Sequence, residues 1–276
     1  MRKLICAVLA LCLACSMAAC AGGNNSSSSA SESSTSESSV VEESSSEAAE
    51  ESSEAAEESS ESGAEATVLS YDEYMAAELD SEVTIQAYVQ AKQSWWEDKA
   101  TVYLQDQDGG YFAYDMACTE EDYEKLTEGT CIQVTGFKSE WSGEVEIMDG
   151  SFTFVEGGDT FVAEALDVTE KLGTEELESY QNQKVSFKGL TVAPSTDANG
   201  GEAAFLYNYD GSGAQGDDLY FNVTVGDSEE VYTFTVESYL CGSDTEVYKA
   251  VEGLQVGQTI DCEGFLYWYE GVNPHI

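Results

Sequence analysis

The sequence predicts a mainly β fold, with two five-stranded barrels that each carry one short helix, preceded by a disordered Ser/Glu-rich tether. Composition changes abruptly near residue 66, and an internal repeat divides the remainder into two similar halves. Each half alternates apolar and polar residues with the period of two that strands require. We therefore expect one barrel at 67–160 and a second at 161–276.

The first residues have the pattern of a secretory signal. Arg2 and Lys3 precede an apolar run over 4–15, which is too short to span a bilayer as a mature helix. The small residues before Cys20 resemble the lipobox of bacterial lipoproteins, although Met17 stands where that family usually has leucine. The resemblance implies a signal peptide at 1–19.

The same resemblance implies that Cys20 carries lipid such as palmitate and anchors the chain on the extracellular face of the cell membrane. Cys15 is a second possible acceptor, and ordinary secretion after cleavage at Ala19 or Ala21 is the alternative without lipid. After Cys20, the segment up to residue 66 is mostly Ser, Glu and Ala, with twelve glutamates and no basic residue. Such a segment cannot bury a core, so we expect a disordered linker.

The folded part is strongly acidic. Twelve of the chain's 54 acidic residues lie in the linker, which leaves 42, and two of its ten basic residues lie in the signal, which leaves eight lysines. Residues 67–276 therefore carry a formal net charge of −34, which disfavours polyanionic partners.

An internal repeat joins residues 126–137 to residues 254–265 without a gap. The matched pairs are Gly129/Gly257, Ile132/Ile260, Gly136/Gly264 and Phe137/Phe265. A turn with an aromatic residue follows each unit, at 141–143 and at 269–271. Two copies are too few for a stacked solenoid, so each should be a self-contained domain.

The elements of the first copy follow from capping and alternation. Ser70 and Glu73 form a capping box that begins a helix ending about Leu79. Further elements are expected as strands at 83–89, 101–105, 111–114, 131–137 and 144–147, with a hairpin turn at 108–110 and a helix at 119–126.

The second copy follows the same order. Strands are expected at 184–192, 203–209, 219–225, 231–236 and 259–267, with a helix near 244–251. A last strand at 272–276 contains Pro274, which cannot donate to a ladder, so that strand must be short or at an edge.

One helix between the third and fourth strands is the order of an OB-fold barrel. The glycine and hydrophobic positions of 81–155, and more loosely of 183–276, also resemble bacterial extracellular OB-fold modules. These positions set turns, so the resemblance implies a fold and no particular chemistry. OB-folds usually bind through the sheet face and the loops between strands one and two and strands four and five.

Those loops hold the candidate ligand-binding residues. They are Trp95, Trp96 and Trp141 in the first copy and Tyr267, Trp268 and Tyr269 in the second. Flat rings at a barrel edge can stack on a sugar, a base or a partner's side chain. Alternatively, they cap the barrel or seal the contact between the two domains.

The sequence thus favours a non-catalytic binding module for a glycan or a protein ligand, without a cofactor. The first alternative is a structural or assembly component of the cell envelope whose aromatics are buried at an interface. The second is a single-stranded nucleic-acid-binding OB protein. The net charge argues against nucleic acid, although Lys92, Lys99 and Lys138 lie near the tryptophan loops.

Other chemistry has little support in the sequence. It contains no GxSxG, HExxH or P-loop motif and a single histidine, His275, so we expect no enzyme. Acidic turns at Asp106 and Asp197 are explained by turn chemistry, so no metal site is expected. Disulfides and free thiols both stay open for Cys118, Cys131, Cys241 and Cys262.

Overall fold

The computed structural model describes residues 67–157 and 159–276, which consist mainly of β-strands with three short α-helices. All of these residues belong to one compact unit. Within them, no helix is both long and apolar enough to cross a membrane. The predicted signal peptide, Cys20 and the linker lie outside the described residues, and the domain boundary near residue 160 stays a prediction.

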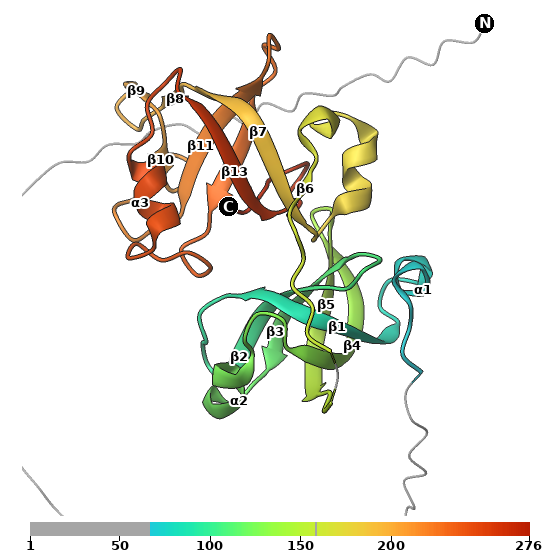
Figure 1. The fold of residues 1–276 in the computed structure, drawn as a ribbon. Coiled ribbons are helices and arrows are strands. Elements are labelled where there is room, and N and C mark those ends of the chain that lie inside the picture. The colour runs from blue at the N-terminus through green and yellow to red at the C-terminus, as the bar shows by residue number, and fades with distance from the viewer. Residues whose placement is uncertain (1–66, 158) are drawn as a thin grey trace, which may run out of the picture. The chain divides into compact units, whose positions relative to one another are not determined.

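The strands of the first half close into a barrel in the order β1-β2-β3-β5-β4 (Figure 1). They are β1 (Glu82–Lys92), β2 (Lys99–Gln105), β3 (Gly110–Ala117), β4 (Cys131–Trp141) and β5 (Glu144–Phe154). Neighbours pair antiparallel except β3 and β5, which meet in parallel at Ala113 and Ile147. The predicted five-stranded barrel is confirmed for this half.

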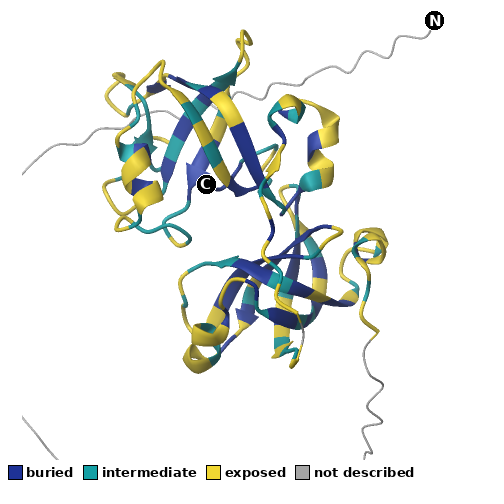
Figure 2. Ribbon diagram, viewed as in Figure 1, coloured by how far each residue is buried: buried dark blue, intermediate teal, exposed yellow. Residues whose placement is uncertain are grey.

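Two short helices accompany the barrel. The Ser70 capping box begins α1 (Tyr71–Ala76), which ends three residues before the predicted Leu79. Thr119 caps α2 (Glu120–Lys125), which lies between β3 and β4 as predicted. The strands are largely buried (Figure 2), β2 at every position after Lys99, and their apolar side chains fill the barrel interior.

The second half is built around β7 (Lys184–Ala193), which pairs with β11 (Leu219–Val225) on one side and β13 (Thr259–Phe265) on the other. Its other elements are β6 (Leu166–Asp167), 3₁₀ helices at Thr169–Lys171 and Glu175–Tyr180, β8 (Ser195–Thr196), β9 (Glu202–Ala203), β10 (Leu206–Tyr207), β12 (Tyr232–Val236) and α3 (Glu246–Glu252). The predicted strand at 203–209 is reduced to two short pieces, so β7 pairs directly with β11.

A second closed five-stranded barrel is not confirmed, because the expected last strand at 272–276 does not form. Isolated backbone bridges at His275 join this segment in parallel to Thr235 of β12 and antiparallel to Phe265 of β13. Pro274 lacks an N–H and limits the pairing to these bridges, although its carbonyl accepts from the Thr235 N–H at 3.0 Å. The segment thus takes the place that β5 has in the first half.

The repeated glycines explain why both halves share this arrangement. A Cβ on Gly136 of β4 would lie 2.7 Å from the carbonyl oxygen of Met148 in β5. A Cβ on Gly264 of β13 would collide in the same way with the carbonyl of His275. Each glycine therefore permits the close approach of the segment that follows it.

A small aromatic cluster joins β2 and β3 to the end of β13. The ring of Tyr103 stacks on Phe265 at 4.2 Å between centroids, and Phe112 packs against both. The hydroxyl of Tyr103 lies 2.9 Å from Nδ1 of His275. These buried contacts link the C-terminal segment to the first barrel.

Candidate ligand-binding site

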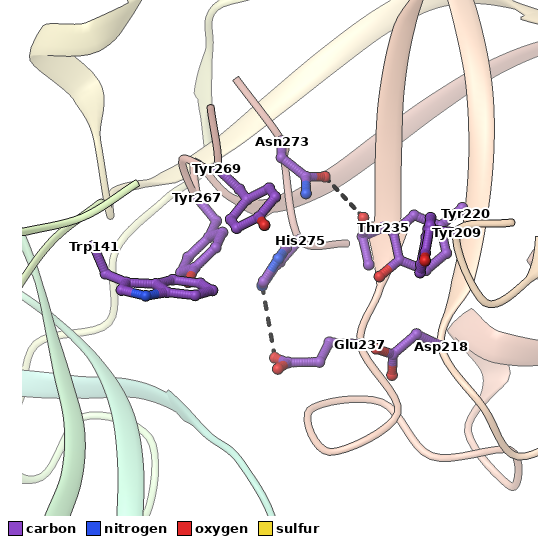
Figure 3. A pocket seen from close by; sticks show the side chains of 10 residues that line it. All are labelled: Trp141, Tyr209, Asp218, Tyr220, Thr235, Glu237, Tyr267, Tyr269, Asn273 and His275. Atoms are coloured by element: carbon purple, nitrogen blue, oxygen red, sulfur yellow. Dashed lines mark hydrogen bonds and ion pairs between the residues drawn. The ribbon is translucent and has the colours of Figure 1, made fainter. Parts of the chain in front are cut away.

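A cavity of about 570 Å³ lies beside the C-terminal segment. Its wall combines aromatic rings, two carboxylates and small polar groups (Figure 3): Trp141, Tyr209, Asp218, Tyr220, Thr235, Glu237, Tyr267, Tyr269, Asn273 and His275. Most of these residues come from the second half, and Trp141 comes from the end of β4. The size and the aromatic lining are typical of a small-molecule site.

Two equivalent turns of the internal repeat build one side of the cavity. The rings of Trp141 and Tyr269 pack with centroids 5.2 Å apart. The N–H of Glu270 donates to the carbonyl of Ser142 at 2.8 Å, which holds the two turns together. The internal repeat in the sequence makes these two turns equivalent, and the structure brings them into contact.

Tyr267 forms the floor behind these rings. Its ring stacks on His275 with centroids 4.1 Å apart. The Asn273 N–H donates to the Tyr267 carbonyl at 3.0 Å, and the side chain of Asn273 accepts from the hydroxyl of Thr235 at 2.8 Å. This network fixes the segment after β13, so the aromatic wall is preorganised.

The charged groups of the cavity are acidic. Burial, together with nearby Asp218, raises the pKa of Glu237 to about 7. The Oε2 atom of Glu237 accepts from Gln93 Nε2 at 2.6 Å, and Asp218 accepts from the backbone N–H and the hydroxyl of Ser238. Neither lysine nor arginine lines this cavity among the described residues.

His275 is uncharged in this setting. Burial lowers the pKa of His275 to about 3, so the 3.6 Å approach of its Nδ1 to Oε2 of Glu237 is not an ion pair near neutral pH. Nδ1 instead shares a hydrogen bond of 2.9 Å with the Tyr103 hydroxyl. The ring therefore acts as a flat, neutral surface beneath Tyr267.

A buried carboxyl supports the turn that carries the aromatic residues. Glu144 is fully buried, and its Oε2 accepts from the Trp268 N–H at 2.9 Å. Burial raises the pKa of Glu144 to about 9, although the hydrogen bond from the Trp268 N–H opposes the shift. Burial also raises the pKa of the neighbouring Glu146 to about 7. Near neutral pH, Glu144 is therefore a neutral carboxylic acid.

Two smaller cavities adjoin the main one through shared residues. One of about 330 Å³ shares Trp141 and Tyr267 with it and adds Tyr114 and Glu146. Another of about 350 Å³ shares Glu237 and contains Trp96. The aromatic lining thus continues from the main cavity onto the first barrel.

The structure divides the six predicted aromatic residues. Trp141, Tyr267 and Tyr269 meet in the main cavity, whereas Trp96 is 69% exposed and lines the adjoining cavity of about 350 Å³. Trp95 donates from Nε1 to the Cys118 carbonyl at 2.9 Å and lines none of these cavities.

Trp268 packs against the core of the second half, and its ring would meet a Cβ on Gly143 at 2.7 Å. The predicted platform of three first-copy tryptophans therefore does not form as one surface. The observed site instead combines one tryptophan of the first copy with two tyrosines of the second.

The lysines near the tryptophan loops are engaged elsewhere. Lys92 Nζ lies 3.6 Å from the centre of the Tyr123 ring and donates to the Tyr123 carbonyl. Lys99 pairs with Asp115 at 3.0 Å. The buried Lys138 donates to the carbonyls of the helix α1 region. The local argument for a phosphate-binding surface is therefore weakened.

The acidic turns and the cysteines have structural roles. The Asp106 carboxylate accepts from the N–H groups of Asp108 and Gly109, and Asp197 caps its own turn similarly. In the described part of the chain, no cluster of three His, Cys, Asp or Glu side chains could hold a metal ion. All four cysteines there are free thiols: Cys118, Cys131, Cys241 and Cys262.

No family model and no curated protein matches the sequence. Among solved structures, the p204 HINb domain is similar over 72% of this chain and 95% of that chain, with 9% identity and a TM-score of 0.33. The Ifi202 HINa domain in complex with 20-bp dsDNA is similar over 58% and 76%, with 14% identity and a TM-score of 0.27. A Replication Protein A heterotrimer bound to ssDNA is similar over 71% and 49%, with 13% identity and a TM-score of 0.26. Similarities at these scores carry no argument about the ligand of this chain.

Proposed function

We propose that this protein is a lipid-anchored bacterial surface protein whose folded part is a non-catalytic module that binds a glycan. The observation that carries the proposal is the cavity of about 570 Å³, in which Trp141, Tyr267 and Tyr269 form an aromatic wall. Apolar ring faces stack on the C–H faces of sugars, while carboxylates and amides bind hydroxyl groups. The cavity supplies both kinds of surface.

The shape of the aromatic surface supports a ligand made of linked units. The main cavity shares Trp141 and Tyr267 with the smaller cavity that contains Tyr114 and Glu146. An oligosaccharide can lie along such a series of rings, one sugar to each. The neutral ring of His275 beneath Tyr267 keeps the wall rigid, which lowers the entropic cost of binding.

Single-stranded nucleic acid is the second candidate ligand, because OB-folds bind it. The main argument against it is the negative net charge of the folded part. Two carboxylates line the main cavity, and neither lysine nor arginine does in the described part of the chain, which disfavours a phosphate backbone. A protein ligand, or burial of the rings in an envelope assembly, would use the same apolar surface.

An array experiment separates these functions. The full chain, in a nonionic polyoxyethylene detergent that carries no sugar, is applied to cell-wall glycans, host glycans and single-stranded oligonucleotides at low and moderate salt. We expect a glycan signal that Trp141→Ala removes and that Trp96→Ala retains, because Trp96 lines the adjoining cavity and not the main one. An oligonucleotide signal that falls steeply with salt would instead support the nucleic-acid function, and silence on the array would favour a protein partner.

The proposed anchor has its own test. Expression in a bacterium with a labelled fatty acid should label the wild-type chain and leave Cys20→Ser unlabelled. Cys15→Ser is the matched control and should keep the label. Loss of the label only in Cys15→Ser would show that Cys15 carries the lipid. An unlabelled wild-type chain would indicate ordinary secretion.

A further inference from the structure

We propose that the glycan bound in the main cavity carries positively charged amino groups. This inference rests on the proposed function and names the class of glycan. Neither lysine nor arginine lines the cavity among the described residues, and His275 is uncharged. The groups that could attract a cation are five aromatic rings and two carboxylates: Trp141, Tyr209, Tyr220, Tyr267, Tyr269, Asp218 and Glu237. This combination of groups fits an ammonium ion better than a neutral or acidic substituent.

The two carboxylates of the cavity interact electrostatically. Figure 3 shows both carboxylates on the same side of the cavity, with Glu237 towards Trp141 and Asp218 towards Tyr209 and Tyr220. The charge of Asp218 contributes to the raised pKa of Glu237, which records their mutual repulsion. An ammonium group placed between them would relieve that repulsion and keep both carboxylates ionised.

The neighbouring protein groups leave the negative charge uncompensated. Glu237 receives a hydrogen bond from the neutral amide of Gln93, and Asp218 receives two from Ser238. His275 is neutral near physiological pH, because burial lowers its pKa to about 3. These neutral donors orient the carboxylates without adding positive charge, so a cationic group of the ligand would supply the missing counter-charge.

The aromatic rings add a second attraction for the same group. Exposed faces of tryptophan and tyrosine attract cations through their quadrupoles, and Trp141 is 55% and Tyr269 45% exposed. A protonated amino sugar presents an ammonium group and an apolar ring face from one unit. A neutral sugar gains only the stacking, and an acidic sugar is repelled.

The test uses three ligands that differ in one substituent. Oligomers of β-1,4-linked glucosamine, N-acetylglucosamine and glucose, of equal chain length, are titrated calorimetrically into the full chain near neutral pH. We expect the glucosamine oligomer to bind at least about tenfold more tightly than the other two, which corresponds to about 1.4 kcal/mol. Added salt should reduce this preference, because it screens ion pairing.

Matched variants assign the preference to the cavity. The double variant Asp218→Asn, Glu237→Gln should bind all three oligomers with similar affinity, whereas Glu229→Gln, in an exposed turn, should keep the preference. Equal or tighter binding of a neutral oligomer by the wild-type chain would overturn this inference and leave the glycan-binding function intact. If none of the three oligomers binds while the array gives another glycan, this inference also fails; if the array gives no glycan, the proposed function fails with it.

Discussion

The buried carboxyl of Glu144 makes the stability of the folded part depend on pH in a direction that is unusual for an acidic residue. Burial raises the pKa of Glu144 from 4.5 to about 9. Below about pH 4.5 the carboxyl is protonated in both the folded and the unfolded chain, so its ionisation does not affect the free energy of unfolding. As the pH rises towards 9, the unfolded chain releases this proton and the folded chain keeps it, so stability falls.

The substitution Glu144→Gln removes this penalty and keeps the shape of the side chain. One pKa unit corresponds to about 1.4 kcal/mol, so the interval from 4.5 to about pH 8 gives an upper value of about 5 kcal/mol. Oε1 of Glu144 and Oδ1 of Asn182 are buried without hydrogen-bond partners in the described part of the chain. The glutamine oxygen can still accept from the Trp268 N–H. We therefore expect a gain of about 3–5 kcal/mol at about pH 8 and less than about 1 kcal/mol at about pH 5.

Urea unfolding of the full chain, followed by tryptophan fluorescence at both pH values, measures these differences. Glu140→Gln removes a carboxylate from an exposed position of β4 and serves as the control for net charge. A Glu144→Gln chain that is less stable than wild type at about pH 8, or that keeps the wild-type dependence on pH, would refute the reasoning.

Two further substitutions test the packing around the cavity. Gly143 has a φ of 96°, and a Cβ added to it would collide with the Trp268 ring. Gly257 has a similar φ of 82° but open space around it, so it serves as the control. We expect Gly143→Ala to lower the free energy of unfolding by about 2 kcal/mol more than Gly257→Ala does. Equal losses in the two urea titrations would contradict the predicted clash. Tyr103→Phe removes the hydrogen bond between the Tyr103 hydroxyl and Nδ1 of His275, so the free energy of unfolding should fall by about 1–3 kcal/mol. An unchanged urea midpoint would show that this bond contributes nothing.

Much of the fold was predictable because its signals are local. The predicted strands at 131–137 and 219–225 begin where β4 and β11 begin, since alternation and flanking turns fix a strand's start. The short β10 and the absence of a strand at 272–276 were harder to predict from the sequence. Pro274 predicted a weak strand, but one of the bridges through His275 depends on Thr235 of β12, which is distant in sequence.

The candidate site was predictable only in part. The repeat identified Trp141 and Tyr269 as equivalent turn residues, and their contact follows from how the two copies pack. Asp218, Tyr220 and Glu237 were missed, because residues at the ends of strands carry no motif and the sequence is rich in acids. These residues can be recognised as a possible binding site only once the tertiary structure shows that they line one cavity.

Indole N–H signals in a nuclear magnetic resonance titration would test the binding site most directly. The chain has four tryptophans, and only Trp141 lines the main cavity. On addition of glucosamine oligomers, the Trp141 signal should shift progressively to saturation, while the signal of the exposed Trp96 should stay in place. A saturable shift of Trp96 with Trp141 unchanged, or no shift of any indole signal with any glycan found on the array, would contradict ligand binding in this cavity.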